Sequence, residues 1–269
     1  MIPATVDYVR APSLAAALTS LEDPEAKALA GGQSLVSLLK LRVIRPTLLV
    51  DIGALELRGV SVRDGVARIG SLTVWSDLAA APELRTPALS ALGECARGIG
   101  DLQVRNRGTV GGSLAHADPA SDLPAVVLAL GATLHVHSSD GEGTRGATEF
   151  FLGPFTTSLE AGELVTEVTL PVPPSGSGSA YVSVEHPASG FALAGAAALV
   201  RADGTRAVAI TGVAAQPLLL DADDPVGSLR DVDVFGDHFA PADYRRHLAS
   251  VVVRRALERA ERRPQEEAT

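Results

Sequence analysis

The chain has 269 residues, 46% of them hydrophobic and 20% charged, a composition typical of a globular protein with about two domains. Its net charge of −9, with no cluster of Lys and Arg before the C-terminal residues, argues against binding to nucleic acid or to an anionic membrane. The single cysteine, Cys95, excludes an internal disulfide, a cysteine-rich zinc site and an iron–sulfur cluster on this chain. No apolar run reaches the roughly 18 residues of a membrane span, and the N-terminus lacks the features of a signal peptide. We therefore expect a cytoplasmic protein.

The first fifty residues predict a β-α-β-α-β unit. Strands are expected at residues 6–9, 27–30 and 47–52. Pro12-Ser13 begins a helix whose apolar residues recur with the spacing of one helix face. A second helix follows Gly31-Gly32, with Ser34 as its capping residue, and ends at Arg45-Pro46.

The second unit begins near Leu57 with a hairpin, because two short strand-like runs flank Asp64-Gly65, a dipeptide typical of tight turns. Further helices are expected at residues 74–80, 87–97 and 123–130. Strands are expected at residues 60–63, 66–69, 133–137 and 164–170.

The clearest boundary is the run of Pro, Gly and Ser from Pro171 to Ser179. Beyond it, strands are expected at residues 180–185, 191–201 and 206–213, followed by a closing helix at 242–262. The residues of that helix expected to face the core are Tyr244, Leu248, Val251, Val252 and Leu257. No regular structure is expected from Pro264 onwards.

Two glycine pairs suggest a cofactor that carries phosphate. Gly31-Gly32 lies between a strand and a helix, where backbone N–H groups approach an anion closely because glycine has no Cβ, and where the helix dipole favours negative charge. The alternative is an ordinary strand-to-helix turn, which for this pair alone is the more common explanation.

The second pair, Gly111-Gly112, lies in a loop with two hydroxyl donors, Thr109 and Ser113. Asp122 is suited to hold a diol such as a ribose, because an ionised carboxylate only accepts hydrogen bonds. The alternative is structural: Asp118 caps a helix that begins at Pro119, which we favour for Asp118, and Asp122 lies at the positive end of the next helix. Neither loop has the Gly-x-Gly-x-x-Gly pattern, which argues against a Rossmann NAD site.

The sequence around both loops resembles the FAD-binding (medium) subunits of the molybdenum hydroxylases, the group of carbon monoxide dehydrogenase, xanthine dehydrogenase and aldehyde oxidase. Ala30-Gly31-Gly32-Gln33-Ser34-Leu35 is similar to the first FAD loop of that family. The run from Arg107 to Gly112, with Ala115-His116-Ala117-Asp118-Pro119 after it, is similar to the second loop. Similarity continues through Phe150 to Pro154 and the closing helix, so it spans nearly the whole chain.

The resemblance implies an α+β fold with two FAD-binding subdomains of the PCMH type, followed by a small α/β C-terminal domain with an antiparallel sheet. The implied ranges are residues 1–55 and 56–170 for the subdomains, 171–179 for a linker and 180–269 for the C-terminal domain. Asp122 would bind the adenosine side of FAD. The implied cofactor-binding residues are Ala30, Gly31, Gly32, Gln33, Ser34, Leu35, Ile99, Thr109, Gly111, Gly112, Ser113, Asp118, Asp122 and Val165.

One departure from the family concerns charge near the flavin. The family has a lysine in the strand after the linker, whereas the run from Tyr181 to His186 has none. A cation there stabilises anionic reduced flavin through opposite charge, so its absence bears on the flavin potential. His186 is one substitute, and a surface histidine at a strand end is the interpretation we favour.

The resemblance implies an electron-transfer subunit of a heteromeric oxidoreductase. Electrons would pass from [2Fe-2S] clusters of a small subunit through FAD to an external acceptor, with the molybdenum cofactor on a large subunit and the whole assembled as a dimer of heterotrimers, a heterohexamer. We nominate no catalytic side chain and no metal ligand, because the flavin itself is the reactive group. The alternatives are a stand-alone FAD-dependent oxidase or reductase of related fold and a flavin-free structural subunit.

Overall fold

Residues 7–51 form the β-α-β-α-β unit expected from the sequence, in a computed structural model that describes residues 2–267. Its three strands are parallel, in the order β1-β3-β2, and the Ser13 hydroxyl caps α1 by accepting from the Ala16 N–H at 3.2 Å. The elements are β1 (Asp7–Arg10), α1 (Leu14–Leu21), β2 (Ala26–Leu29), α2 (Leu35–Lys40) and β3 (Leu48–Asp51).

Two details of α2 differ from expectation. Ser34 makes no side-chain capping bond, because its backbone (φ −93°, ψ −51°) already has helical angles, whereas a capping residue is extended. The helix ends at Lys40 rather than at Arg45-Pro46, because Arg42 takes a left-handed conformation with φ 57° that turns the chain away.

The second unit is built on an antiparallel sheet in the order β4-β5-β10-β6-β7. Its strands are β4 (Val60–Arg63), β5 (Val66–Gly70), β6 (Thr133–Ser138), β7 (Gly141–Gly146) and β10 (Leu164–Pro171), and the short strands β8 (Phe151–Gly153) and β9 (Thr156–Thr157) form a separate two-stranded sheet. The hairpin at Asp64-Gly65 is confirmed. The sequence did not predict β7, because its run Gly-Glu-Gly-Thr-Arg-Gly has little strand propensity and pairing with β6 alone makes it a strand.

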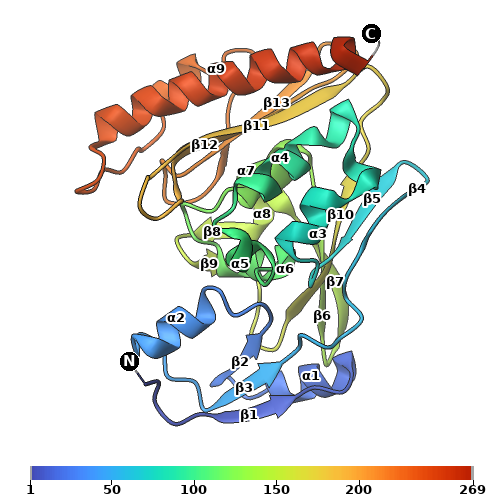
Figure 1. The fold of residues 1–269 in the computed structure, drawn as a ribbon, viewed down its shortest axis with the longest axis vertical. Helices are drawn as coiled ribbons and strands as arrows, with labels where there is room; N and C mark the ends of the chain where they lie inside the picture. Colours follow the sequence, from blue (N-terminus) through green and yellow to red (C-terminus); the bar gives the residue numbers. More distant parts are fainter. Residues whose placement is uncertain (1, 268–269) are drawn as a thin grey trace.

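Helices of the second unit lie between the five-stranded sheet and the C-terminal sheet (Figure 1). They are α3 (Trp75–Ala80), α4 (Ser90–Gly98), α5 (Leu102–Arg105), α6 (Val110–His116), α7 (Leu123–Ala129) and α8 (Ala147–Phe150), with 3-10 turns η1 (Pro82–Leu84) and η2 (Pro87–Leu89). Cys95 is buried in α4, within the helix expected at residues 87–97.

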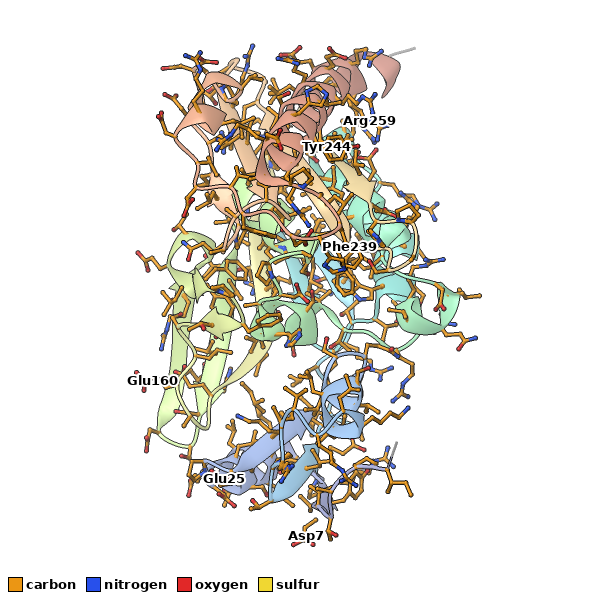
Figure 2. All side chains as sticks on the ribbon, turned by 90° about the vertical axis from the view of Figure 1, so that its left-hand side faces the viewer. Asp7, Glu25, Glu160, Phe239, Tyr244 and Arg259 are labelled. Atoms are coloured by element: carbon orange, nitrogen blue, oxygen red, sulfur yellow. The ribbon has the colours of Figure 1, made fainter. Side chains whose placement is uncertain are left out.

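The C-terminal sheet is buried on both faces. One face packs on α9 and the other on α4 and α7, so that the apolar run of β12 divides between two core clusters: Ala194, Ala196 and Ala198 face α9, and Ala197 and Leu199 face α4 and α7. The elements are β11 (Gly178–Glu185), β12 (Ala192–Val200), β13 (Arg206–Thr211), β14 (Leu218–Leu219), η3 (Gly227–Arg230) and α9 (Ala242–Glu267). Figure 2 shows α9, with Tyr244 and Arg259, at the opposite end of the molecule from Asp7 and Glu25.

The inner face of α9 is rotated from the expected one at its first turn. Tyr244 is 47% exposed, which corrects the prediction that it faces the core, and Arg245 is 4% exposed in its place. The Arg245 guanidinium donates to the carbonyls of Leu193 (2.8 Å) and Gly212 (2.6 Å) and pairs with Asp237 at 2.7 Å. These contacts compensate the burial of its two terminal nitrogens, while its Nε atom has no partner among the described residues.

The end of α9 also differs from expectation. The helix continues past Pro264 to Glu267, while residues 268–269 of the predicted irregular end lie outside the described residues. Pro264 predicts a helix end, but packing of α9 on β11 outweighs that local preference. The helix lies so close to β11 that a Cβ on Gly178 would be 2.1 Å from the Ala260 carbonyl oxygen.

The predicted domain division stays a prediction. Strand β10 ends at Pro171 and β11 begins at Gly178, so of the predicted linker only residues 172–177 lie outside strands. None of the helices within residues 2–267 combines the length and the apolar character that crossing a bilayer requires.

Candidate functional site

The fold brings the two glycine loops into contact. Gly31 lies against the backbone of the residue that opens the second loop: a Cβ on Gly31 would be 2.0 Å from the carbonyl oxygen of Arg107. A cavity of about 120 Å³ lies at this contact, lined by Ala30 and Gly31 from one loop and by Arg107 and Thr109 from the other. The two motifs, about eighty residues apart in the chain, therefore form one site.

The first loop presents unused backbone donors. Within residues 2–267, no hydrogen bond uses the N–H group of Gly31, Gly32, Gln33 or Ser34. Gly32 has φ +76°, a left-handed conformation that glycine adopts without strain. Consecutive free N–H groups at a strand-to-helix turn form a concave anion site, so this loop fits a diphosphate such as that of FAD.

The second loop has a different structure and a different role. It is the start of α6, which Thr109 caps by accepting from the Gly112 N–H at 3.2 Å. The N–H groups of Val110 and Gly111 donate to the carbonyls of Thr73 (3.0 Å) and Ser71 (2.7 Å). These amides are therefore committed within the protein, and the second loop offers a close-packed wall and hydroxyl groups rather than backbone donors.

Gly111 is required by that close packing. A Cβ on Gly111 would lie 2.5 Å from the Cβ of Ser71, which is closer than real side chains approach. The Ser113 hydroxyl bonds the Ser121 hydroxyl at 2.9 Å and thereby ties α6 to the loop that follows it.

The cavity between the loops is mostly positive. Arg10, Arg58 and Arg107 line it, with Asp51 as the one carboxylate among its lining residues. Burial pushes the pKa of Asp51 up, but hydrogen bonds from the Tyr8 hydroxyl (2.5 Å) and the Gly53 N–H (2.8 Å), with the nearby Arg10 and Arg107, hold it below its usual value. Asp51 therefore stays ionised beside the arginines.

Asp118 caps a turn rather than a helix. Its carboxylate accepts from the Ala120 N–H at 2.9 Å, and α7 begins only at Leu123, with Pro124 in its first turn. The expected helix start at Pro119 is thus wrong. The chain needs an irregular segment there because Ala117 ends α6 in a left-handed conformation (φ 48°) and redirects the backbone.

Asp122 occupies the expected position at the N-terminus of α7 but has a partner that sequence reasoning missed. The buried Tyr181 hydroxyl, on β11, donates to its Oδ1 atom. Burial raises the pKa of Asp122 to about 6, and Glu185 adds to the effect, while the Tyr181 hydrogen bond opposes it. Burial likewise raises the pKa of Tyr181 well above its usual value.

The C-terminal sheet also holds the segment before Asp122. The Thr211 hydroxyl contacts the carbonyl oxygens of Pro119 (3.0 Å) and Ser121 (2.7 Å), and the Gly212 N–H donates to Pro119 at 2.9 Å. Sequence reasoning missed Tyr181 and Thr211, because both fit an ordinary strand pattern and only their position against α7 gives them a role.

The two apolar residues expected near the cofactor lie in or on one core cluster. Val165 on β10 is buried in the cluster that contains Val110 of α6, and Ile99, at the end of α4, packs against it. His186 follows β11 half-buried, with its ring 4.4 Å from that of Phe239. No lysine stands in β11, as the sequence indicated.

Comparisons with known proteins agree with this geometry. Residues 4–173 match the family model described as the FAD binding domain in molybdopterin dehydrogenase. The glyceraldehyde dehydrogenase medium chain of Sulfolobus acidocaldarius is 42% identical over 206 residues, covering 76% of this chain and 73% of that protein. The carbon monoxide dehydrogenase medium chain of Afipia carboxidovorans is 33% identical over 287 residues, covering 98% and 99%.

The fold is similar to that of a solved carbon monoxide dehydrogenase from Hydrogenophaga pseudoflava, which lacks the Mo-pyranopterin moiety of the molybdenum cofactor. The TM-score is 0.93 at 34% identity, over 98% of this chain and 99% of that one.

Proposed function

The chain belongs to the FAD-binding medium subunits of the molybdenum hydroxylase family, and from this premise we propose that it carries electrons within a heteromeric oxidoreductase. It would receive them from [2Fe-2S] clusters on a small partner subunit and pass them to an external acceptor. A large partner would hold the molybdenum cofactor, and the assembly would be a dimer of heterotrimers. The cytoplasmic location and the domain ranges remain predictions of the same kind.

The observation that carries the proposal is the donor set of the first loop. Four successive N–H groups, from Gly31 to Ser34, have no acceptor within the described chain, and the contact with Arg107 fixes their position. The arginines that line the adjoining cavity add positive charge. These residues would hold the diphosphate, while Thr109 and Ser113 line the second side.

The division of labour follows from what this chain lacks and what it supplies. FAD, when bound, supplies reversible one-electron and two-electron chemistry. The protein contributes binding, orientation and electrostatics, and with Cys95 as its single thiol it provides no set of cysteines for a cluster. Iron–sulfur and molybdenum chemistry would therefore belong to partner chains.

Replacement of Gly31 by Ala tests whether the first loop binds the diphosphate of FAD. The new Cβ meets the Arg107 carbonyl, so the loops must separate, and we expect the affinity for FAD to fall at least about tenfold, the loss of one charge-assisted hydrogen bond. Isothermal titration of deflavinated protein with FAD measures it. Gly146→Ala is the matched control, because its Cβ would meet only the Thr148 hydroxyl at an ordinary 3.6 Å.

Three results would count against the proposal. Equal FAD affinity for Gly31→Ala and the control would contradict the assignment of the first loop as the diphosphate site. A chain that binds no FAD would favour a flavin-free structural subunit. Sustained turnover of alcohols or amines by the purified chain alone would favour a stand-alone oxidase. Co-purification with partners that carry molybdenum and iron is the expected outcome.

A further inference from the structure

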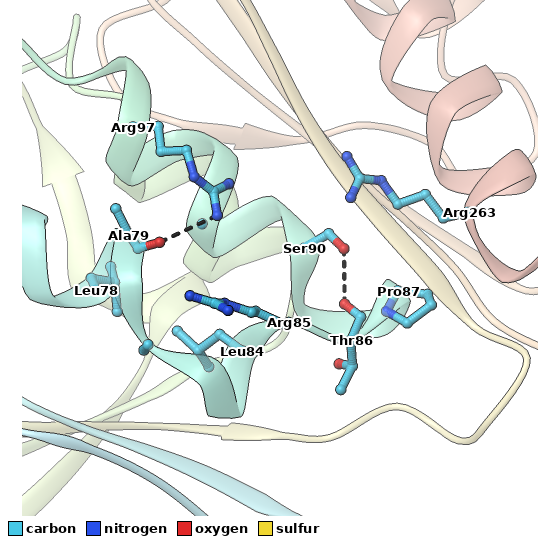
Figure 3. A pocket seen from close by; sticks show the side chains of 11 residues that line it. Leu78, Ala79, Leu84, Arg85, Thr86, Pro87, Ser90, Arg97 and Arg263 are labelled. Atoms are coloured by element: carbon cyan, nitrogen blue, oxygen red, sulfur yellow. Dashed lines mark hydrogen bonds between the residues drawn. The ribbon is translucent and has the colours of Figure 1, made fainter. Parts of the chain in front are cut away.

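A second and larger cavity, of about 370 Å³, lies apart from the glycine loops. It is formed by α3, the turns η1 and η2, α4 and the last turns of α9 (Figure 3). This volume is within the range of small-molecule sites in proteins. The cavity contains three arginines, Arg85, Arg97 and Arg263, in a chain whose net charge is −9.

Two of these arginines are held in place by the end of α3. Arg85 donates to the Ala80 carbonyl at 3.1 Å and Arg97 donates to the Ala79 carbonyl at 3.2 Å. Gly93 leaves room for the Arg97 side chain, whose Nη1 atom lies 3.2 Å from where a Cβ on Gly93 would be. Each guanidinium is thus oriented by a single hydrogen bond and keeps further donors unused.

Two of the three arginines have no counter-charge. Among residues 2–264, no carboxylate lies within 4.0 Å of Arg85 or Arg97. The nearby acid, Glu94, is already shared by Arg259 and Arg263, and the buried Nε atom of Arg263 has no hydrogen-bond partner among residues 2–264. Figure 3 shows the guanidinium group of Arg97 directed toward Arg85, with Arg263 on α9 at the opposite side of the cavity.

The remaining wall combines apolar residues, among them Ala79, Ala81 and Pro87, with the polar Thr86 and Ser90. Arginine binds carboxylate and phosphate groups through paired N–H donors, and an apolar wall suits the carbon skeleton that carries such a group. We propose that this cavity binds a small organic anion, whose carboxylate or phosphate is held by Arg85 and Arg97 and whose body lies against Ala79 and Pro87. The site is independent of the flavin.

Calorimetric titration of the FAD-loaded protein tests the proposal, with inorganic phosphate, phenyl phosphate and benzoate as probes at constant ionic strength. We expect one saturable site that binds phenyl phosphate more tightly than phosphate, because the ring adds contact with the apolar wall. The comparison of phenyl phosphate with benzoate separates a phosphate ligand from a carboxylate ligand.

Variants locate the binding. Arg97→Gln and, separately, Arg85→Gln should each weaken phenyl phosphate binding by about tenfold, the loss of one charge-assisted contact. Arg68→Gln is the matched control: it removes the same charge from an exposed position on β5, where Arg68 pairs with Glu167 at 2.8 Å.

Three outcomes would overturn the proposal. They are the absence of saturable binding of any of the three probes, an equal loss in Arg68→Gln, and binding that disappears when FAD saturates the protein. The two arginine variants are separate single changes at exposed side chains, so a folding defect in one leaves the other as the test.

Discussion

Asp122 shows how a single residue changes its properties with its surroundings. As an isolated carboxylate it would be ionised well below neutral pH, but burial, with Glu185 nearby, raises its pKa to about 6 against the opposing hydrogen bond from Tyr181. Between about pH 4 and pH 6, the folded chain keeps a proton at Asp122 that the unfolded chain has released. This carboxyl therefore makes the folded state lose stability as the pH rises through that window.

Asp122→Asn should remove this dependence on pH, because the amide does not titrate and its oxygen still accepts from Tyr181. We expect the free energy of unfolding of the variant, relative to the parent, to rise between pH 4 and pH 7 by up to about 3 kcal/mol. Urea unfolding at several pH values measures it.

Asp203→Asn serves as a control of opposite sign. Hydrogen bonds from Thr205 hold the pKa of Asp203 below its usual range, so its ionised form stabilises the folded chain and the variant should lose, not gain, relative stability as the pH rises. A flat difference for Asp122→Asn would contradict the raised pKa.

At the scale of elements, the second glycine loop depends on strands that come much later in the chain. Its continuation, residues 117–122, is held by Tyr181 of β11 and by Thr211 at the end of β13. Gly195 on β12 makes this possible, because a Cβ there would lie 2.3 Å from the Tyr181 hydroxyl. The C-terminal sheet thus positions a loop of the FAD-binding region.

Tyr181→Phe should loosen that loop. Loss of the hydroxyl leaves the partly buried Asp122 carboxylate without its donor, and we expect a loss of about 1–3 kcal/mol in the free energy of unfolding. Amide hydrogen exchange should become faster in residues 117–122. Tyr244→Phe removes the same atom from an exposed side chain and should change neither quantity. Unchanged exchange in Tyr181→Phe would show that the other contacts, from Thr211 and Gly212, hold the loop without Tyr181.

Local signals predicted most elements, and the failures have identifiable causes. Apolar periodicity placed α1, α4 and α7, and a turn dipeptide placed the hairpin at Asp64-Gly65. Glycine twice suggested irregular structure where a regular element forms. Strand β7 is rich in glycine yet pairs as a strand, and α6 begins with a glycine pair that was expected to lie in a loop. In both cases pairing or packing with distant residues outweighs local propensity.

At the scale of the whole molecule, Glu94 connects three parts of the chain. It lies on α4 with its side chain 17% exposed, accepts from the Tyr181 N–H of β11 at 2.8 Å, and pairs with Arg259 and Arg263 of α9. One carboxylate therefore joins the FAD-binding region to both the sheet and the helix of the C-terminal part.

Glu94→Gln should weaken this connection. It leaves two arginines without a counter-charge, and we expect a loss of about 2 kcal/mol in the free energy of unfolding. Trp75, the single tryptophan, lies on α3, so its fluorescence follows the FAD-binding region, whereas far-UV circular dichroism follows the whole chain. The two thermal transitions should separate in the variant and coincide in the parent.

Glu261→Gln is the control for that comparison. Glu261 pairs with Arg206 at 3.3 Å, but both side chains are more than 40% exposed, and solvent screens such pairs. We expect its two transitions to coincide. Coinciding transitions in Glu94→Gln as well would mean that the remaining contacts couple the two parts without Glu94.

The sequence by itself determined the fold class, the order of most elements, the family and the two glycine motifs, because these depend on local spacing and on residues that lack a Cβ. Tertiary structure alone decided what each motif contributes. In the first loop, Gly31 lies against Arg107 and the backbone N–H groups stay free. In the second loop, the N–H groups donate to the carbonyls of Ser71 and Thr73. Tyr181, Glu94 and the arginine cavity acquire their roles only through approach between distant segments, which no local pattern records.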